Sequence, residues 1–133
     1  MKNMIAITLA SLMMTQSIAI TAPTTMPVPT EDKPVVMVQS TNPEFTIKLK
    51  SNPTTGYTWF LRGYDATILE PIKKHYEASP NKKLLGAPGY ETWTFRVKAH
   101  GFVVPMQTFI RFVYSRPWEM NSQAKQVVFQ VST

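Results

Sequence analysis

Short runs in which apolar and polar side chains alternate constrain the fold of this chain more than any other feature of its sequence. Residues 45–50 alternate strictly, which is the period of a strand with one buried face. Further β-prone runs lie at 35–39, 57–62, 68–76, 90–98, 109–115 and 127–131. No extended stretch has the period of an amphipathic helix. We therefore expect an all-β protein, an immunoglobulin-like antiparallel β-sandwich of about seven to eight strands.

Several strand residues carry expectations of their own. Pro71 interrupts the run at 68–76, so we expect that strand to be weak and broken. In residues 109–115, the odd-numbered and the even-numbered positions, which face opposite sides of a strand, are both largely apolar. This pattern predicts a strand buried over much of both faces. Trp59 and Trp93 lie at strand positions, where the core is the usual place for an aromatic ring.

The N-terminal segment differs in composition from the rest of the chain. Lys2 precedes a mostly apolar stretch at residues 4–14, and Ser17 and Ala19 are small residues at the −3 and −1 positions of a cleavage site. Polar residues interrupt the apolar stretch, which is shorter than the ~20 residues of a membrane span. An uncleaved membrane tether is therefore the less favoured alternative. We predict a signal peptide at 1–19, a Pro- and Thr-rich linker at 20–34, one domain at 35–133, and a secreted or periplasmic protein without stable membrane insertion.

The chain has no cysteine and carries 14 lysine and arginine residues against 8 acidic residues. The absence of cysteine excludes disulfides, thiolate metal sites and thiol catalysis, so the domain must be held together by core packing alone. The basic residues are scattered in pairs, which is not the pattern of a nucleic-acid-binding surface. We expect a monomer with no cofactor, no metal and no nucleic-acid partner.

Little in the sequence points to an enzyme. His75 and His100 are the only histidines, and no nucleophile motif, metal-ligand cluster or phosphate-binding loop accompanies them. We therefore expect no catalytic residues and two surface histidines. An exported binding module, for carbohydrate or of adhesin type, stays open as the alternative function. Such a module would present aromatic rings on a sheet face.

Residues 52–57, Asn-Pro-Thr-Thr-Gly-Tyr, form a stiff turn of small residues directly before a strand. Pro53 fixes its own φ and disfavours a helical Asn52, and Gly56 permits a positive φ or a close backbone approach. The two threonines between them add small side chains with hydroxyl donors. Turn chemistry by itself leaves two interpretations: a tight hairpin connection, which it favours, and a preformed wedge for another surface.

Three loops next to strong strands form a set. They are Asn52-Pro53-Thr54-Thr55-Gly56-Tyr57, Gly86-Ala87-Pro88-Gly89 and Arg116-Pro117-Trp118-Glu119, the last of which follows Tyr114. In order, spacing and residue type this set resembles the chagasin family of cysteine-peptidase inhibitors, over residues 35–133. The hexamer and the Arg-Pro-Trp segment carry most of the resemblance. In one departure, Pro88 stands where members of the family often have another glycine, which should stiffen that loop.

The resemblance implies a reversible, tight-binding inhibitor of papain-like, cathepsin L-type cysteine peptidases, either the organism's own or a host's. It implies that the loop with Thr54, Thr55 and Gly56 enters the catalytic cleft, while the loops at Gly86–Gly89 and Arg116–Trp118 flank that cleft. Small side chains suit a narrow cleft that contains a thiolate nucleophile. With the three loops taken together, the wedge becomes the favoured interpretation of the hexamer.

Three residues of these loops also have purely structural interpretations. Trp118 is of a type enriched in binding hot spots, and its alternative is a rim residue packed on its own loop. The alternative role of Arg116 is a surface ion pair with Glu119, and such a pair contributes little to stability. For Tyr57 we expect a ring that supports the loop and a hydroxyl that reaches a backbone group.

Overall fold

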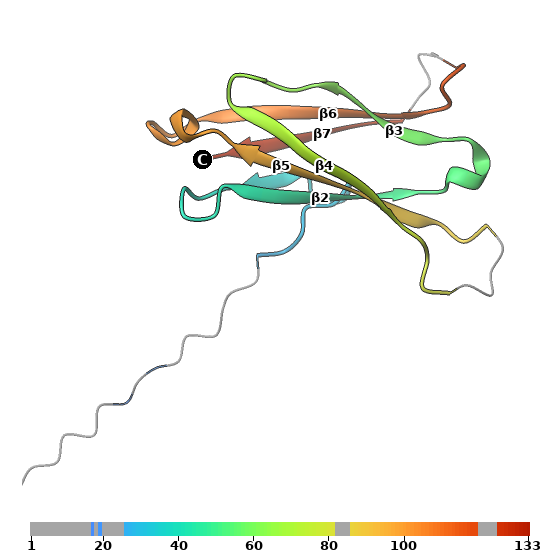
Figure 1. The fold of residues 1–133 in the computed structure, drawn as a ribbon, viewed down its shortest axis with the longest axis horizontal. Coiled ribbons are helices and arrows are strands. Elements are labelled where there is room, and N and C mark those ends of the chain that lie inside the picture. Colours follow the sequence, from blue (N-terminus) through green and yellow to red (C-terminus); the bar gives the residue numbers. More distant parts are fainter. Residues whose placement is uncertain (1–16, 18, 20–25, 82–85, 120–124) are drawn as a thin grey trace, which may run out of the picture.

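The computed structural model describes residues 17, 19, 26–81, 86–119 and 125–133, and these build a β-sandwich (Figure 1). Its strands are β1 (Val35–Met37), β2 (Glu44–Ser51), β3 (Thr58–Gly63), β4 (Leu69–Glu77), β5 (Gly89–Val97), β6 (Gln107–Ser115) and β7 (Lys125–Ser132). Two short 3₁₀ turns, η1 (Pro53–Thr55) and η2 (Ala99–Phe102), are the remaining regular elements of this part of the chain. Across the same residues, no helix has the length and hydrophobicity that a membrane span requires.

The strands form two sheets that face each other (Figure 1). One sheet has the order β1-β7-β6-β3 and the other the order β2-β5-β4. Neighbouring strands are antiparallel except for β1 and β7, which are parallel. The predicted all-β, immunoglobulin-like sandwich is confirmed, with one parallel pair added. Side-chain alternation has the same period in both strand directions, so the sequence pattern does not reveal that pair.

Alternate side chains of the strands fill the space between the two sheets. Ile47 and Leu49 of β2, Phe95 of β5 and Phe112 of β6 are fully buried. The rings of Phe95 and Phe112 meet edge to face across the sheets, with centroids 6.2 Å apart. Burying a side chain of this size contributes about 1.5–3 kcal/mol to folding. A core of such residues is what stabilises a domain that has no disulfide.

Both strand tryptophans contact this core, as predicted. Trp59 is buried, and its Nε1 donates a hydrogen bond to the carbonyl oxygen of Lys50 at 2.9 Å. Trp93 is partly buried and packs edge to face on Phe112, with ring centroids 5.2 Å apart. The Nζ of Lys74 lies 4.8 Å from the centre of the Trp93 ring, within cation–π range.

Two of the strand predictions are wrong. β4 is continuous across Pro71, because β4 is an edge strand and its register shifts between Pro71 and Lys73. β6 is buried mainly on one face: Ile110 and Phe112 point into the core, whereas Phe109 on the other face is 51% exposed. The second sheet covers one face of β6, whereas Gln107, Phe109 and Arg111 on the other face are exposed.

Part of the predicted linker lies against the sandwich. The backbone N–H of Lys48 donates to the carbonyl oxygen of Pro29 at 3.0 Å, and Thr30 forms a parallel bridge with Lys48. Residues 29 and 30 therefore run beside β2. The predicted signal peptide falls almost entirely on residues outside the described ones, so it stays a prediction.

Candidate functional site

Three connections between strands lie at the same end of the sandwich, on the right in Figure 1. They follow β2, β4 and β6 and comprise residues 52–57, 78–88 and 116–124, of which 82–85 and 120–124 lie outside the described residues. The strand register places them together, since Ser51 is opposite Gly89 and Thr58 is opposite Ser115. We call them the first, second and third loop. The predicted site residues all come from these loops or from the strand ends beside them.

The first loop is not a hairpin, because it passes from β2 in one sheet to β3 in the other. Pro53 begins the 3₁₀ turn η1, and the N–H of Gly56 closes the turn by donating to the carbonyl oxygen of Pro53 at 3.0 Å. Gly56 has a φ of 80°, a left-handed conformation that side-chain-bearing residues avoid. Both backbone expectations for this turn, the fixed proline and the permissive glycine, agree with its geometry.

The threonine hydroxyls of the first loop are used inside the loop. Thr54 Oγ1 donates to the side-chain oxygen of Asn52, and Thr55 Oγ1 donates to the backbone oxygen of Asn52, each at 2.6 Å. Each hydroxyl has a single hydrogen to donate. In the free protein these donors therefore hold the shape of the loop and do not point toward a partner.

Two tyrosines support the first loop: Tyr57 at its end and Tyr114 on β6. The N–H of Asn52 donates to the hydroxyl of Tyr114 at 2.9 Å, and the rings of Tyr57 and Tyr114 stack with centroids 5.3 Å apart. The ring of Tyr57 therefore supports the loop, as expected. Its hydroxyl differs from the expectation, because it lies 3.5 Å from the carboxylate of Glu119 and not next to a backbone group.

The third loop contacts the first through Arg116. The Nε of Arg116 donates to the carbonyl oxygen of Thr55 at 3.1 Å, and its Nη1 forms an ion pair with Glu119 at 3.1 Å. The guanidinium also lies 4.6 Å from the centre of the Tyr57 ring. The ion pair with Glu119 exists, but it belongs to a contact that joins two loops.

Trp118 is the most exposed aromatic ring at this end, with 71% of its surface accessible. A Cβ atom built on Gly56 would lie 3.2 Å from Cη2 of Trp118, so the indole covers the open side of Gly56. The ring therefore lies against the first loop. Pro117, beside it, is exposed as well.

The second loop is tied to the first by a side chain. Nδ2 of Asn52 donates to the carbonyl oxygen of Gly86 at 2.9 Å. Gly86 has a φ of 79° and open space around it, and Pro88 is exposed, with Ala87 half-buried between them. Gly89 differs from these three, since it is the buried first residue of β5. A Cβ there would come within 2.3 Å of a backbone oxygen of β4.

Sequence reasoning missed Glu91, a buried carboxylate directly beneath the first loop. Its Oε1 accepts hydrogen bonds from Ser51 Oγ at 2.8 Å, Thr58 Oγ1 at 2.8 Å and the N–H of Trp59 at 3.2 Å. Its Oε2 forms an ion pair with Nζ of Lys74 at 3.0 Å. The signal was present, because alternation in the run 90–98 places this glutamate on the same inward face as Trp93.

The surroundings of Glu91 also change its acidity. Burial alone would raise the pKa of its carboxyl, but the contacts with Lys74, Ser51 and Thr58 outweigh burial and lower it. An ionised carboxylate offers only acceptors, which matches the donors around it.

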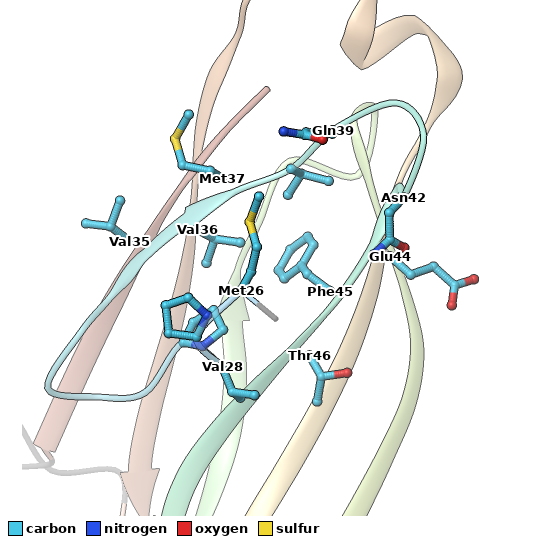
Figure 2. A pocket seen from close by; sticks show the side chains of 13 residues that line it. Met26, Val28, Val35, Val36, Met37, Gln39, Asn42, Glu44, Phe45 and Thr46 are labelled. Carbon is cyan, nitrogen blue, oxygen red and sulfur yellow. The ribbon is translucent and has the colours of Figure 1, made fainter. Parts of the chain in front are cut away.

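The described residues at the loop end do not form a metal-binding cluster. Among those residues, no group of three or more His, Cys, Asp or Glu side chains is arranged to hold a metal ion. A cavity of about 600 Å³ lies instead near the start of β2, where the side chain of Met26 projects between the strands that carry Val36 and Phe45 (Figure 2). Both histidines are exposed, as expected.

The fold and the three connected loops define a β-sandwich protein that presents a preformed loop surface at one end. Residues 39–132 match the model described as chagasin family peptidase inhibitor I42. The chain therefore belongs to the chagasin family of peptidase inhibitors, which are not enzymes. It is 36% identical to chagasin from Trypanosoma cruzi over 77 residues, which cover 54% of this chain and 64% of chagasin.

Two solved structures have a similar fold. One is the crystal structure of the cysteine protease inhibitor EhICP2 from Entamoeba histolytica, with a TM-score of 0.63 and 22% identity over 78% of this chain and 91% of that one. The other is the solution structure of amebosin, with a TM-score of 0.57 and 24% identity over 79% of this chain and 96% of that one.

Proposed function

We propose that this protein is a reversible, tight-binding inhibitor of papain-like cysteine peptidases, and that it blocks the catalytic cleft with its three loops. The observation that carries the proposal is that all three loops lie at one end and are bonded to one another through Asn52–Gly86 and Arg116–Thr55. Membership of the chagasin family supports it. The family relation also makes this function more favoured than that of a carbohydrate-binding or adhesin-type module.

The first loop suits the cleft of such an enzyme. Its tip, at Thr54 to Gly56, is exposed or half-buried and carries no large side chain. Because its threonine hydroxyls and backbone groups are already bonded within the loop, little ordering entropy remains to be lost on binding. A rigid loop also resists adopting the extended geometry that a peptidase needs for cleavage.

The other two loops provide the flanking contacts of this proposal. Trp118 offers a large exposed ring, and tryptophan and arginine are the residue types most enriched among binding hot spots. The exposed Gly86 and Pro88 lie at the end of the second loop, which Asn52 contacts through the carbonyl oxygen of Gly86. Together with Pro53, Tyr57 and Pro117, these residues form the proposed peptidase-binding surface of a monomer.

The test is a titration of papain and of a cathepsin L-like enzyme with the purified protein. The measured quantity is the rate at which each enzyme hydrolyses a peptide substrate. We expect complete inhibition at micromolar protein, recovery of activity on dilution, and an intact inhibitor chain after incubation. A serine peptidase assayed in parallel should keep its activity. Full activity of both cysteine peptidases at micromolar protein would contradict the proposal.

We also propose that the chain is exported to the periplasm or beyond, with cleavage after Ala19. The basic start, the apolar stretch and the small residues at 17 and 19 support export. N-terminal sequencing of the protein from periplasmic and medium fractions should find a chain that begins near Ile20. A cytoplasmic chain that retains Met1 would contradict this proposal.

A further inference from the structure

We propose that Glu91 is a positioning residue that fixes both ends of the first loop and so sets the shape of the inhibitory surface. Glu91 is not part of that surface, since it is 3% exposed and lies beneath it. The inference about inhibition rests on the proposed function, whereas the inference about loop shape does not.

The geometry joins the two ends of the loop at one atom. Ser51 is the last residue of β2 and Thr58 is the first residue of β3, so the first loop spans the gap between them. Both hydroxyls donate to the same oxygen, Oε1 of Glu91, at 2.8 Å. Since β2 and β3 belong to different sheets, this carboxylate holds together two strands that do not pair with each other.

A second contact keeps the carboxylate ionised and oriented. Lys74 of β4 pairs with Oε2 at 3.0 Å, and its Nζ also lies 3.4 Å from Thr58 Oγ1 and over the Trp93 ring. Tyr76 is the residue of β4 directly opposite Glu91 in the sheet. The ion pair leaves Oε1 free to accept from the two loop ends and from the N–H of Trp59.

The loop depends on its ends because it has little burial of its own. None of the residues of η1 is buried, so no core contact fixes the tip. Its shape relies on hydrogen bonds within the loop, on its contacts with the neighbouring loops, and on the positions of Ser51 and Thr58. A change in the distance between these two strand ends would therefore be passed directly to the tip.

The experiment compares three variants with the wild-type chain. Glu91→Met removes both oxygens at similar volume, Glu91→Gln keeps one accepting oxygen, and the double variant Ser51→Ala/Thr58→Val keeps Glu91 and removes the two loop-end donors. Val131→Ala is the control, because it opens the buried core without touching the loops. Each protein is measured for its melting temperature, its inhibition constant for papain, and the NMR order parameters of the Thr55 and Gly56 amides.

For Glu91→Met and for the double variant, we expect an inhibition constant about tenfold to a hundredfold higher. The loop order parameters should fall from about 0.85 toward about 0.6. For Glu91→Gln, we expect the inhibition constant and the loop order parameters to stay close to those of the wild type. Val131→Ala should lower the melting temperature while leaving the inhibition constant and the order parameters unchanged.

The outcomes separate the two inferences. If Glu91→Met lowers only the melting temperature, as Val131→Ala does, then Glu91 is a core residue and the proposal is overturned. The double variant decides the matter if Glu91→Met does not fold. If the wild-type chain does not inhibit papain, the proposed function fails, and the order parameters still decide whether Glu91 positions the loop.

Discussion

The Nε atom of Arg116 donates a hydrogen bond to the carbonyl oxygen of Thr55 over 3.1 Å, and this contact ties the third loop to the tip of the first. On the other side, Asn52 holds the second loop through the carbonyl oxygen of Gly86. The first loop is therefore fixed from both flanks. Fixing loops before binding reduces the ordering entropy that binding must overcome.

Arg116→Ala should weaken inhibition while leaving the fold intact. The change removes the hydrogen bond to Thr55, the ion pair with Glu119 and the contact with the Tyr57 ring. We expect a loss of about 1.5–3 kcal/mol in binding, the range of a hydrogen bond to a charged group. The measurements are the inhibition constant for papain and the melting temperature.

The matched control for this change is Arg96→Ala. Arg96 is exposed and, like Arg116, forms surface ion pairs, in its case with Glu44 and Glu70, but it lies toward the other end of the sandwich. The Arg96→Ala variant loses the same charge as Arg116→Ala without changing a contact of the three loops, so it should still inhibit papain. Equal losses in the two variants would assign the effect to net charge and not to the contact between loops.

Trp118→Ala should cost about 2 kcal/mol of binding, which is roughly a thirtyfold rise in the inhibition constant. The ring is largely exposed in the free protein, so the melting temperature should change little. Phe109→Ala is the control, because Phe109 is an exposed aromatic residue on the outer face of β6. An unchanged inhibition constant for Trp118→Ala would make this ring a rim residue.

The strand pattern could be predicted from the sequence because burial has a simple period in a sandwich. The alternation in residues 45–50 and 90–98 matches the buried faces of β2 and β5. The apolar run at 109–115 was misleading, since exposed positions of β6 also carry apolar residues such as Phe109. Hydrophobicity permits burial but does not require it.

The contacts that connect the loops could not be predicted in the same way. Arg116 and Thr55 are 61 positions apart, and Asn52 and Gly86 are 34 apart. Neither pair has a local pattern that shows which donor meets which carbonyl group. Glu91 was more accessible to prediction, because an acidic residue on an inward strand face requires several donors around it.

Gly56→Ala and Gly86→Ala should separate backbone strain from contact with Trp118. Both glycines have a positive φ, 80° and 79°, so each alanine should cost about 1 kcal/mol of stability. Only the Gly56 variant places a Cβ atom against the Trp118 ring, while the space at Gly86 is open. We expect similar melting temperatures for the two variants and a clearly larger loss of papain inhibition for Gly56→Ala.

A different result would change the role of the first loop. If Gly56→Ala lowers the melting temperature far more than Gly86→Ala and still inhibits papain, then the turn at Gly56 is a structural element and not the tip that enters the cleft. Gly56→Val, which adds more bulk at the same place, should extend whichever trend the alanine variant shows.

The lowered pKa of Glu91 predicts how stability changes with pH. Its folded-state pKa lies below the ordinary value of 4.5, so the unfolded chain binds more protons between those two values. The contribution of Glu91 to the free energy of unfolding is fully present above the unfolded pKa and is lost as the pH falls through the folded pKa.

In urea unfolding between about pH 7 and pH 3, the wild type should therefore lose stability more steeply below pH 4.5 than Glu91→Gln. Hydrogen bonds from Thr67 also lower the pKa of Asp65. This carboxyl group is present in both proteins, so it contributes equally to the pH dependence of their stability. Parallel pH profiles would show that the carboxylate of Glu91 does not stabilise the folded state in its ionised form.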